Sequence, residues 1–333
     1  MSGPTISQDD PMRLLCSEHF NDAYARVRPH ISKTRCIKSE RLSAEAGGDV
    51  FLKLENEQIT GSFKIRGVTN KILSLGETAR AKLLIAASSG NHGAAFAHTV
   101  TKLGLRGELF TAENIAAVKR EALEGFGVPI TFVGTDCVEA EVAARAHSER
   151  VAGTLVGPYN DIDVILGQGT IGIELMDQLG TFDVLFVPVG GGGLISGIAA
   201  YLKSIGSETK IVGCQPEHSP VMLESIRAGR IVEMESLPTL ADATAGGIEP
   251  GAITLELCRE LVDDFVVLSE KEIVEALKVL HLEEGIVAEG GSAMTVAAVR
   301  KRTDLVKGKR AALVISGGKI DAAIIEQLGS KDD

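Results

Sequence analysis

The stretch VLFVPVGGGGLISGIAAYL, residues 184–202, decides the fold of this chain. Its apolar run Val184–Val189 predicts a buried strand, the glycines Gly190 to Gly193 predict a tight loop, and the apolar residues from Leu194 onward predict a helix. Pro188 and the glycines interrupt the uncharged stretch, so we interpret it as strand, loop and helix and not as a membrane span. Such a unit is typical of open parallel sheets with helices on their faces.

The same pattern recurs along the rest of the chain. Short β-branched or apolar runs alternate with longer segments in which apolar residues lie three and four positions apart beside charged ones. That alternation predicts parallel sheets joined by crossover helices. The predicted strands are Val50–Leu54, Leu83–Ala87, Ile130–Val133, Val184–Val189, Ile211–Cys214, Phe265–Leu268 and Ala311–Ser316, and the predicted helices include Asn91–Leu103, Val138–Val151, Ile253–Val262 and Lys271–Leu282.

Composition narrows the classes of function. The chain has 333 residues, of which 44% are hydrophobic and 24% charged, so wholesale disorder is excluded. Its 34 Lys and Arg residues against 45 Asp and Glu residues give a net charge of -11, which repels a phosphate backbone, and we expect neither a nucleic-acid nor a membrane partner. Asp9, Asp10 and Arg13 break up any secretory signal, which predicts a cytoplasmic location. The five cysteines lie far apart and form no metal-binding pattern, so no metal site is expected.

The glycine loop has the chemistry of a phosphate site. Backbone N–H groups converge at the start of a helix, and glycine lets an anion approach closely because no Cβ intervenes. The loop does not fit the dinucleotide pattern G-x-G-x-x-G, since Ile195 or Ser196 takes the third glycine position, and this opposes a nicotinamide oxidoreductase. It does not fit a P-loop either, since Ile198 follows Gly197 where a lysine is needed. A single phosphate remains, with an empty tight turn as the alternative.

Two further small-residue loops follow predicted strands. They are Ser88-Ser89-Gly90-Asn91-His92-Gly93 and Ser316-Gly317-Gly318. Open parallel sheets bind their ligands at this edge, so the three loops together favour a ligand site. Asn91 alone could equally cap the helix that it begins.

Lys64 is the candidate catalytic residue. It lies in Ser62-Phe63-Lys64-Ile65-Arg66-Gly67, where Ser62 is expected to cap a helix that runs to about Leu75. The positive end of the helix dipole and the nearby Arg66 would favour the neutral amine, which is the form that attacks a carbonyl. That is the chemistry of a Schiff-base lysine, with a solvated surface lysine as the alternative.

Taken in order, these pieces resemble the fold-type II pyridoxal-phosphate enzymes, in the branch of the serine/threonine dehydratases and serine racemases. The resemblance implies an α/β fold like that of the tryptophan synthase β subunit, with two open, twisted, mostly parallel sheets flanked by helices and pyridoxal 5'-phosphate in the cleft between two domains. We expect residues 1–81 and 160–333 to form the large cofactor-binding domain, residues 82–159 the small domain, and two chains a homodimer. The matching motifs are Leu54-Glu55-Asn56, Gly61 to Gly67, Ser88 to Gly93, Gly167-Gln168-Gly169-Thr170, Gly190 to Gly193 and Ser316-Gly317-Gly318.

The resemblance also implies a role for each matched residue. Lys64 would hold the cofactor by a Schiff base and take the α-proton of the substrate, with Phe63 beside the ring. Ser316 would face the pyridine nitrogen, Asn91 would bond the phenolic oxygen, and Glu289 would lie near the ring. The phosphate would lie on Gly190, Gly191, Gly192, Gly193 and Leu194, and the substrate carboxylate on Ser88, Ser89, Asn91 and His92.

These roles predict a dehydratase that converts a β-hydroxy amino acid such as L-threonine or L-serine to a 2-oxo acid and ammonia. A serine at 316 does not keep the ring nitrogen protonated as an aspartate would, and this favours elimination over transamination. Racemisation of serine or aspartate is the alternative, because Ser89 matches the serine that reprotonates the α-carbon in racemases of the family. Gln215 and Val221 replace two carboxylates of the family's Mg²⁺/Ca²⁺ site, so we expect that site to be absent.

Two other interpretations stay open. The segment Ala245-Gly246-Gly247-Ile248-Glu249-Pro250-Gly251 resembles dehydratases of ectoine or hydroxyectoine breakdown, which favours a catabolic role on an ectoine-derived hydroxy amino acid. A small-molecule sensor built on a retired enzyme scaffold is the other, and the presence of Lys64 opposes it.

Overall fold

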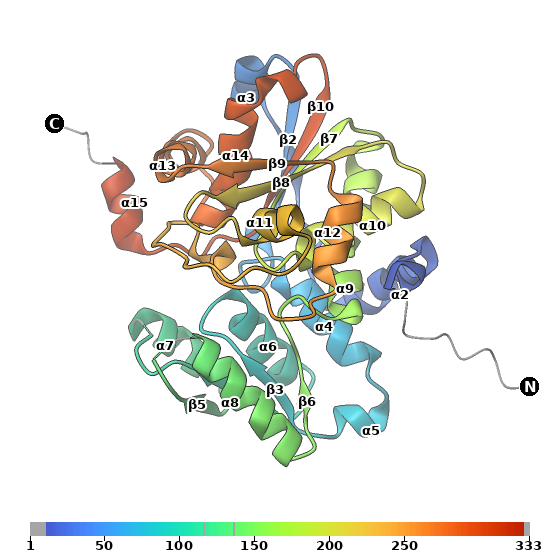
Figure 1. Cartoon of the computed structure of the whole chain (residues 1–333), viewed down its shortest axis with the longest axis vertical. Helices are drawn as coiled ribbons and strands as arrows, with labels where there is room; N and C mark the ends of the chain where they lie inside the picture. The colour runs from blue at the N-terminus through green and yellow to red at the C-terminus, as the bar shows by residue number, and fades with distance from the viewer. Residues whose placement is uncertain (1–10, 116, 136, 330–333) are drawn as a thin grey trace, which may run out of the picture.

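The computed structural model describes residues 11–115, 117–135 and 137–329, and over this part the chain forms two β-sheets flanked by helices. Figure 1 shows the larger sheet in the upper half of the molecule and the smaller sheet in the lower half. The helices α4 (Lys64–Ser74) and α9 (Ile162–Leu179) lie between them. The prediction of an α/β fold with two mostly parallel sheets is confirmed.

The larger sheet has six strands in the order β1-β2-β10-β7-β8-β9. Five of them run parallel, and only β1 pairs antiparallel, with β2. Side chains alternate between the two faces: Val184 and Phe186 pack in one core, and Leu185 and Val187 in the other. Both faces are apolar because helices cover both. The strands are β1 (Cys36–Ser39), β2 (Asp49–Leu54), β7 (Val184–Pro188), β8 (Lys210–Pro216), β9 (Asp264–Leu268) and β10 (Arg310–Ile315).

The smaller sheet has four parallel strands in the order β5-β4-β3-β6. Its faces alternate in the same way, because Leu84 and Ala86 pack in one core and Ile85 in the other. All four carboxyl ends therefore meet at one edge, from which the loop 88–93 emerges. The strands are β3 (Leu84–Ala87), β4 (Gly107–Thr111), β5 (Ile130–Phe132) and β6 (Thr154–Leu155).

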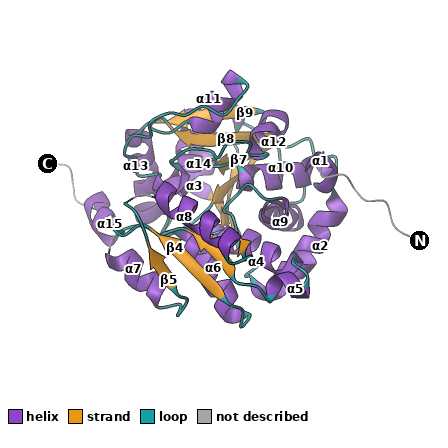
Figure 2. Ribbon diagram, turned by 60° about the horizontal axis from the view of Figure 1, so that its bottom comes forward, coloured by secondary structure: helices purple, strands orange, loops and turns teal. Residues whose placement is uncertain are grey.

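Helices cover the faces of both sheets, as Figure 2 shows. On the larger sheet, α3 (Glu40–Ala46), α13 (Glu270–Lys278) and α14 (Gly290–Lys301) cover one face, and α2 (Ser17–Val27), α9, α10 (Gly193–Ser204) and α12 (Thr254–Leu261) cover the other. On the smaller sheet, α6 (Asn91–Lys102) and α8 (Cys137–Arg150) lie on opposite faces. The remaining α-helices are α1 (Pro11–Leu14), α5 (Glu77–Arg80), α7 (Ala117–Glu124), α11 (Val221–Ala228) and α15 (Ala322–Gly329), and one π-helical turn spans Val279–Glu283.

Helix α4 contacts both halves of the molecule. Its Ile65, Val68 and Ile72 pack in the core of the smaller sheet. On another face, Gly67 lies so close to α9 that a Cβ there would come within 2.3 Å of the Gln168 Nε2 atom. The side chain at the start of α4 is thus held from both sides.

The start of α4 differs from the prediction in one respect. Phe63 is the N-cap residue and its side chain makes no capping bond, so the prediction that Ser62 caps the helix is wrong. The backbone of Ser62 instead forms an antiparallel bridge with Gly317, and its buried hydroxyl has no protein partner. The segment before α4 is extended because it pairs with the chain that leaves β10.

The seven predicted strands are all present in the described residues, within a residue or two at their ends. The prediction missed β1, β4 and β6. No helix of the described part is both long and apolar enough to cross a lipid bilayer.

Candidate active site

Lys64 is the first residue of α4, and its side chain is partly buried. Its Nζ donates to the carbonyl oxygen of Pro158 at 3.0 Å and lies 5.2 Å from the centre of the Phe63 ring. Burial lowers the pKa of Lys64 to about 8, while the charge of Glu289 acts in the opposite direction. A substantial fraction of the amine is therefore neutral near pH 8, as a nucleophile or a proton acceptor must be.

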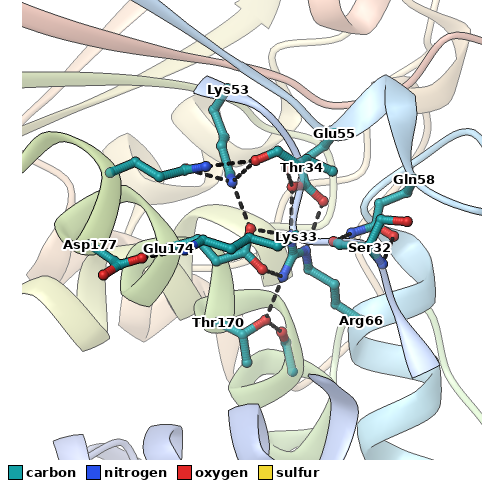
Figure 3. Close-up of polar contacts among 12 residues, drawn as sticks. Ser32, Lys33, Thr34, Lys53, Glu55, Gln58, Arg66, Thr170, Glu174 and Asp177 are labelled. Carbon is teal, nitrogen blue, oxygen red and sulfur yellow. Dashed lines mark hydrogen bonds and ion pairs between the residues drawn. The ribbon is translucent and has the colours of Figure 1, made fainter. Parts of the chain in front are cut away.

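Arg66 does not lower the pKa of Lys64, contrary to the prediction. All five N–H groups of its guanidinium are engaged: two donate to Glu55, both at 2.8 Å, two to Glu174 at 2.8 and 2.9 Å, and one to Thr170 at 3.2 Å. Lys53 adds a second cation, whose Nζ donates to Glu174 at 2.6 Å. Figure 3 shows how this buried cluster gathers side chains from β2, α4 and α9 and from the segment between β2 and α4. Two cations and two anions cancel, so the cluster adds little net field at Lys64.

The buried cluster fixes where α4 begins. Arg66, Lys53 and both carboxylates are fully buried in this part of the structure. Burial alone would raise the pKa of Glu55, yet Arg66 outweighs it and holds that pKa below its usual value. Because Arg66 is only two residues from Lys64, the bonds that hold it also hold the backbone that carries the amine.

The short segment Pro158-Tyr159 contacts both Lys64 and the glycine loop. Pro158, which accepts the bond from Lys64, precedes Tyr159, and the ring of Tyr159 packs on the loop. A Cβ at Gly191 would come within 2.5 Å of that ring, and a Cβ at Gly193 within 2.9 Å of the Tyr159 Cβ. The loop ends at Gly192, which has φ +86 and is the N-cap of α10. Its backbone N–H groups at this helix start form a cradle that an anion could reach.

Ser316 directly follows β10 and is bonded to Phe63, the residue before Lys64. Its carbonyl oxygen accepts from the backbone N–H of Phe63 at 3.0 Å, and its hydroxyl lies 3.2 Å from that of Ser292. Both serines are buried. The Ser292 hydroxyl gives its one proton to the carbonyl oxygen of Gly317 at 2.7 Å, so between the two serines Ser316 is the donor. Turned toward a ligand instead, the Ser316 hydroxyl would donate to a nitrogen that carries no proton.

Asn91 joins the smaller sheet to this site. It is the first residue of α6, and its amide nitrogen donates to the two carboxylate oxygens of Glu289 at 3.1 and 2.9 Å. Gly90 is the N-cap, so the alternative that Asn91 caps the helix is wrong. Burial raises the pKa of Glu289 to about 7, against the bond from Asn91. The backbone N–H of Glu289 donates to Gly317 at 3.0 Å, next to Ser316.

His92 and the two serines complete the loop after β3. The Nε2 of His92 lies 2.9 Å from the carbonyl oxygen of Val156, and burial lowers the pKa of this ring to about 3. The ring is thus neutral and Nε2 carries the proton, which makes His92 a fixed part of the loop and not a proton carrier at neutral pH. Ser88 accepts from the backbone N–H of Gly90 at 3.1 Å, and Ser89 lies beside it, half-buried.

The residues present fit pyridoxal phosphate. Two buried polar atoms near Lys64, the Asn91 Oδ1 and the His92 Nδ1, have no partner in the protein. Buried polar groups are nearly always bonded, so these atoms point to a bound ligand or water. The glycine cradle and the partly neutral amine supply the two other contacts that the cofactor needs. Sequence reasoning did not find Pro158, Tyr159 or Ser292, because a carbonyl group and packing contacts leave no motif.

A family model described as pyridoxal-phosphate dependent enzyme matches residues 27–317. The chain belongs to this family. It is 40% identical to an L-threonine ammonia-lyase of Thermotoga maritima over 96% of this chain and 79% of that protein. Among solved structures, threonine deaminase isoform 2 of Solanum lycopersicum matches with a TM-score of 0.89 and 29% identity, over 98% of this chain and 95% of that one. Maize serine racemase matches with a TM-score of 0.86 and 30% identity, over 92% and 96%.

These relatives confirm the predicted class, a pyridoxal-phosphate-dependent lyase of the serine/threonine dehydratase branch. Pyridoxal phosphate is its cofactor, as predicted. In the described part of the chain, no three His, Cys, Asp or Glu side chains group as metal ligands would. The side-chain amide of Gln215 accepts from the backbone N–H of Leu223 at 2.9 Å and donates to the carbonyl oxygen of Val189 at 3.3 Å.

Proposed function

We propose that this enzyme is an L-threonine ammonia-lyase, which removes ammonia from L-threonine and leaves 2-oxobutyrate. L-serine would give pyruvate in the same way. The observation that carries the proposal is the partly neutral Lys64 amine, bonded to Pro158 beside the glycine cradle, in a chain 40% identical to an L-threonine ammonia-lyase.

Lys64 has two tasks in this proposal. Its Nζ would hold the cofactor through the aldehyde carbon, and once displaced by the substrate amine, the same Nζ would accept the α-proton. Bound pyridoxal phosphate supplies the electron sink that makes this proton removable. The Pro158 carbonyl orients the amine, since it accepts one of its protons at 3.0 Å.

The other residues hold the two reaction partners. Backbone N–H groups of Gly190, Gly191, Gly192, Gly193 and Leu194 would hold the phosphate, and Phe63 would lie beside the ring. Ser316 would turn its proton from Ser292, 3.2 Å away, to the pyridine nitrogen. Asn91 would turn from Glu289 toward the phenolic oxygen. A serine would leave the pyridine ring a weaker electron sink than an aspartate would. Departure of the β-hydroxyl together with the α-proton is then favoured over transamination.

The loop after β3 would receive the substrate carboxylate through Ser88, Ser89, Asn91 and His92. The neutral His92 ring already donates its one proton to Val156, so His92 would contribute its backbone N–H, and the serine hydroxyls would donate without losing their protons. Ser89 also keeps racemisation as a second activity, because its hydroxyl could return a proton to the α-carbon on the face opposite Lys64. The likeness to maize serine racemase supports testing for it.

The test follows L-threonine by proton NMR in heavy water with the purified holoenzyme. We expect 2-oxobutyrate to form and Lys64→Ala to abolish this turnover together with the absorption of the lysine-bound cofactor. Lys71→Ala is the matched control, since Lys71 lies on the same helix and pairs with Asp161. Turnover by Lys64→Ala at the wild-type rate would overturn the mechanism, and loss of the α-proton signal without 2-oxobutyrate would identify a racemase. Ser89→Ala should remove racemisation and spare elimination.

Three further features stay predictions: the division into residues 1–81 with 160–333 and residues 82–159, the homodimer, and the cytoplasmic location. Support for them comes from the family resemblance and the sequence. Light scattering on the eluted holoenzyme checks the dimer, and limited proteolysis checks the domain boundaries, because exposed linkers are cleaved first.

A further inference from the structure

A cavity of about 170 Å³ lies at the carboxyl edge of the smaller sheet. The ends of β3, β4 and β5 surround it, because these parallel strands are in register at Ala87 with Phe110 and Thr111 with Phe132. Its polar lining comes from Ser88, Ser89, Thr111, Asn114 and Thr135. The carboxyl edge is where open parallel sheets bind their ligands, and the cavity lies directly against the loop proposed to hold the substrate carboxylate.

The position of the cavity relative to Lys64 follows from the strand order. Pro158, which contacts the lysine, follows β6, whereas the cavity lies over β4 and β5. The loop that begins with Ser88 emerges from β3, between them. Because Ser88 and Ser89 line the cavity, a substrate held by this loop with its α-proton toward Lys64 can extend its side chain into the cavity.

The side chains that line the cavity favour an uncharged polar group. None of the lining side chains carries a charge. Thr111 is 1% exposed, and its hydroxyl has no partner in the protein. A buried hydroxyl without a partner is unfavourable, so a ligand that forms a hydrogen bond with it recovers a bond that the free protein lacks. Asn114 and Thr135 are exposed and lie at the mouth, and the Thr135 hydroxyl is already bonded to Glu139.

The volume exceeds what threonine needs. Beyond its β-carbon, L-threonine carries only a methyl group and the departing hydroxyl. A water molecule takes up about 30 Å³ in the liquid, so the cavity has room for several further non-hydrogen atoms.

We infer that this cavity binds the end of the substrate side chain, and that the preferred substrate is a β-hydroxy amino acid extended beyond threonine by an uncharged polar group such as a hydroxyl or an amide. The inference rests on the proposed function. Thr111 is the residue that selects the polar end, and Asn114 contributes at the mouth.

The first experiment compares two substrates of equal shape with the holoenzyme. In 4-hydroxythreonine a hydroxyl takes the place of the terminal methyl group of 3-hydroxynorvaline. We expect kcat/KM to be about tenfold higher for 4-hydroxythreonine than for 3-hydroxynorvaline. Thr111→Val should bring the ratio of the two kcat/KM values close to one, since this variant removes the Thr111 hydroxyl and keeps the shape of the side chain. Asn114→Leu should also lower the ratio of the two kcat/KM values, and it changes an exposed residue. Thr131→Val is the matched control, because the Thr131 hydroxyl bonds Glu108 outside the cavity, and it should keep the wild-type ratio.

The second experiment measures binding without turnover. L-homoserine ends in a hydroxyl and L-norvaline in a methyl group, as 4-hydroxythreonine and 3-hydroxynorvaline do. Neither has a β-hydroxyl to lose, so their Kd values can be measured from the change in cofactor absorption. L-homoserine should bind about tenfold more tightly in the wild type, and equally with L-norvaline in Thr111→Val. A ratio near one in the wild type, or a ratio that neither variant changes, overturns the inference. If no β-hydroxy amino acid is turned over at all, the proposed function fails, and the two Kd values still decide whether the cavity selects a polar end.

Discussion

Lys64 differs from most lysines because its surroundings favour the neutral amine. Its pKa of about 8 in the folded chain lies below the value of 10.5 of an exposed lysine, and the cause is burial. Between these two pH values the unfolded chain holds a proton that the folded chain has released. Folding is therefore penalised fully below pH 8, and the penalty disappears as the pH rises toward 10.5.

The cost of burying the Lys64 ammonium can be tested in the apoprotein. Lys64→Met should be more stable than the wild type at pH 7, by up to about 3 kcal/mol from the charge alone, because it removes the buried ammonium. The gap should shrink at pH 10. Urea unfolding of the apoproteins at both pH values measures it. Lys71→Met should show the opposite sign, since Lys71 pairs with Asp161 and Asp163. An equal gap at pH 7 and pH 10 would show that burial of charge is not the cause.

His92 gives a second prediction at this scale. Burial and the nearby Lys64 lower the pKa of its ring to about 3. Its ring-proton NMR signals should therefore stay constant between pH 5 and pH 8 in the folded apoprotein. A titration midpoint near 6.5, the value of an exposed histidine, would contradict the neutral ring bonded to Val156.

At the scale of elements, the buried cluster around Arg66 holds helix α4 to β2 and α9. Arg66→Met would leave Glu55 and Glu174 with one cation instead of two. Removing one partner of a buried ion pair typically costs about 3–5 kcal/mol, and we expect a loss of that order in urea unfolding. The Arg35–Glu57 pair is the matched control, because Arg35 is largely exposed, and Arg35→Met should cost at most about 1 kcal/mol. Equal losses would mean that the cluster is not the anchor of α4.

Some strands could be predicted from the sequence and others could not. The strands with long apolar runs, such as Val184–Pro188, were predictable because both faces are buried and the run is uninterrupted. By contrast, β1 has the sequence C-I-K-S, and β6 has only two residues, so neither carries a pattern of its own. They become strands because a neighbour pairs with them, which is a contact between distant parts of the chain.

Some residues of the candidate site could be named from the sequence, and others could not. Lys64, the glycine loop, Asn91 and Ser316 could be named as candidates because each lies in a short motif with a recognisable chemistry, and their roles stay predictions. The partners of Arg66 were not, since Glu174 is more than a hundred positions away in the chain and α9 gives no sign of which residue faces the cluster. The sequence therefore suggested that Arg66 acts on the lysine, whereas the structure shows that Arg66 is neutralised.

At the scale of the whole molecule, the candidate site lies where the two halves meet. Lys64, Ser316 and the glycine loop come from the side of the larger sheet, and Asn91 and His92 follow β3 of the smaller one. A cofactor that binds both sides favours the folded arrangement by mass action, by about 2.7 kcal/mol at a concentration 100 times its Kd. Pyridoxal phosphate should therefore raise the Tm of the apoprotein by several degrees.

The glycine cradle decides whether that increase occurs. A Cβ at Gly191 would come within 2.5 Å of the Tyr159 ring, so Gly191→Ala must displace either the ring or the loop. The phosphate contacts then lose their geometry, and we expect the Tm increase with pyridoxal phosphate to fall below about a quarter of its wild-type value. Gly76→Ala is the control, because no atom lies within 4 Å of a Cβ there, and it should keep the full increase. Differential scanning calorimetry with and without the cofactor compares the three proteins. A full increase in Gly191→Ala would mean that the phosphate does not bind this loop, and that the contact between Tyr159 and the loop serves folding alone.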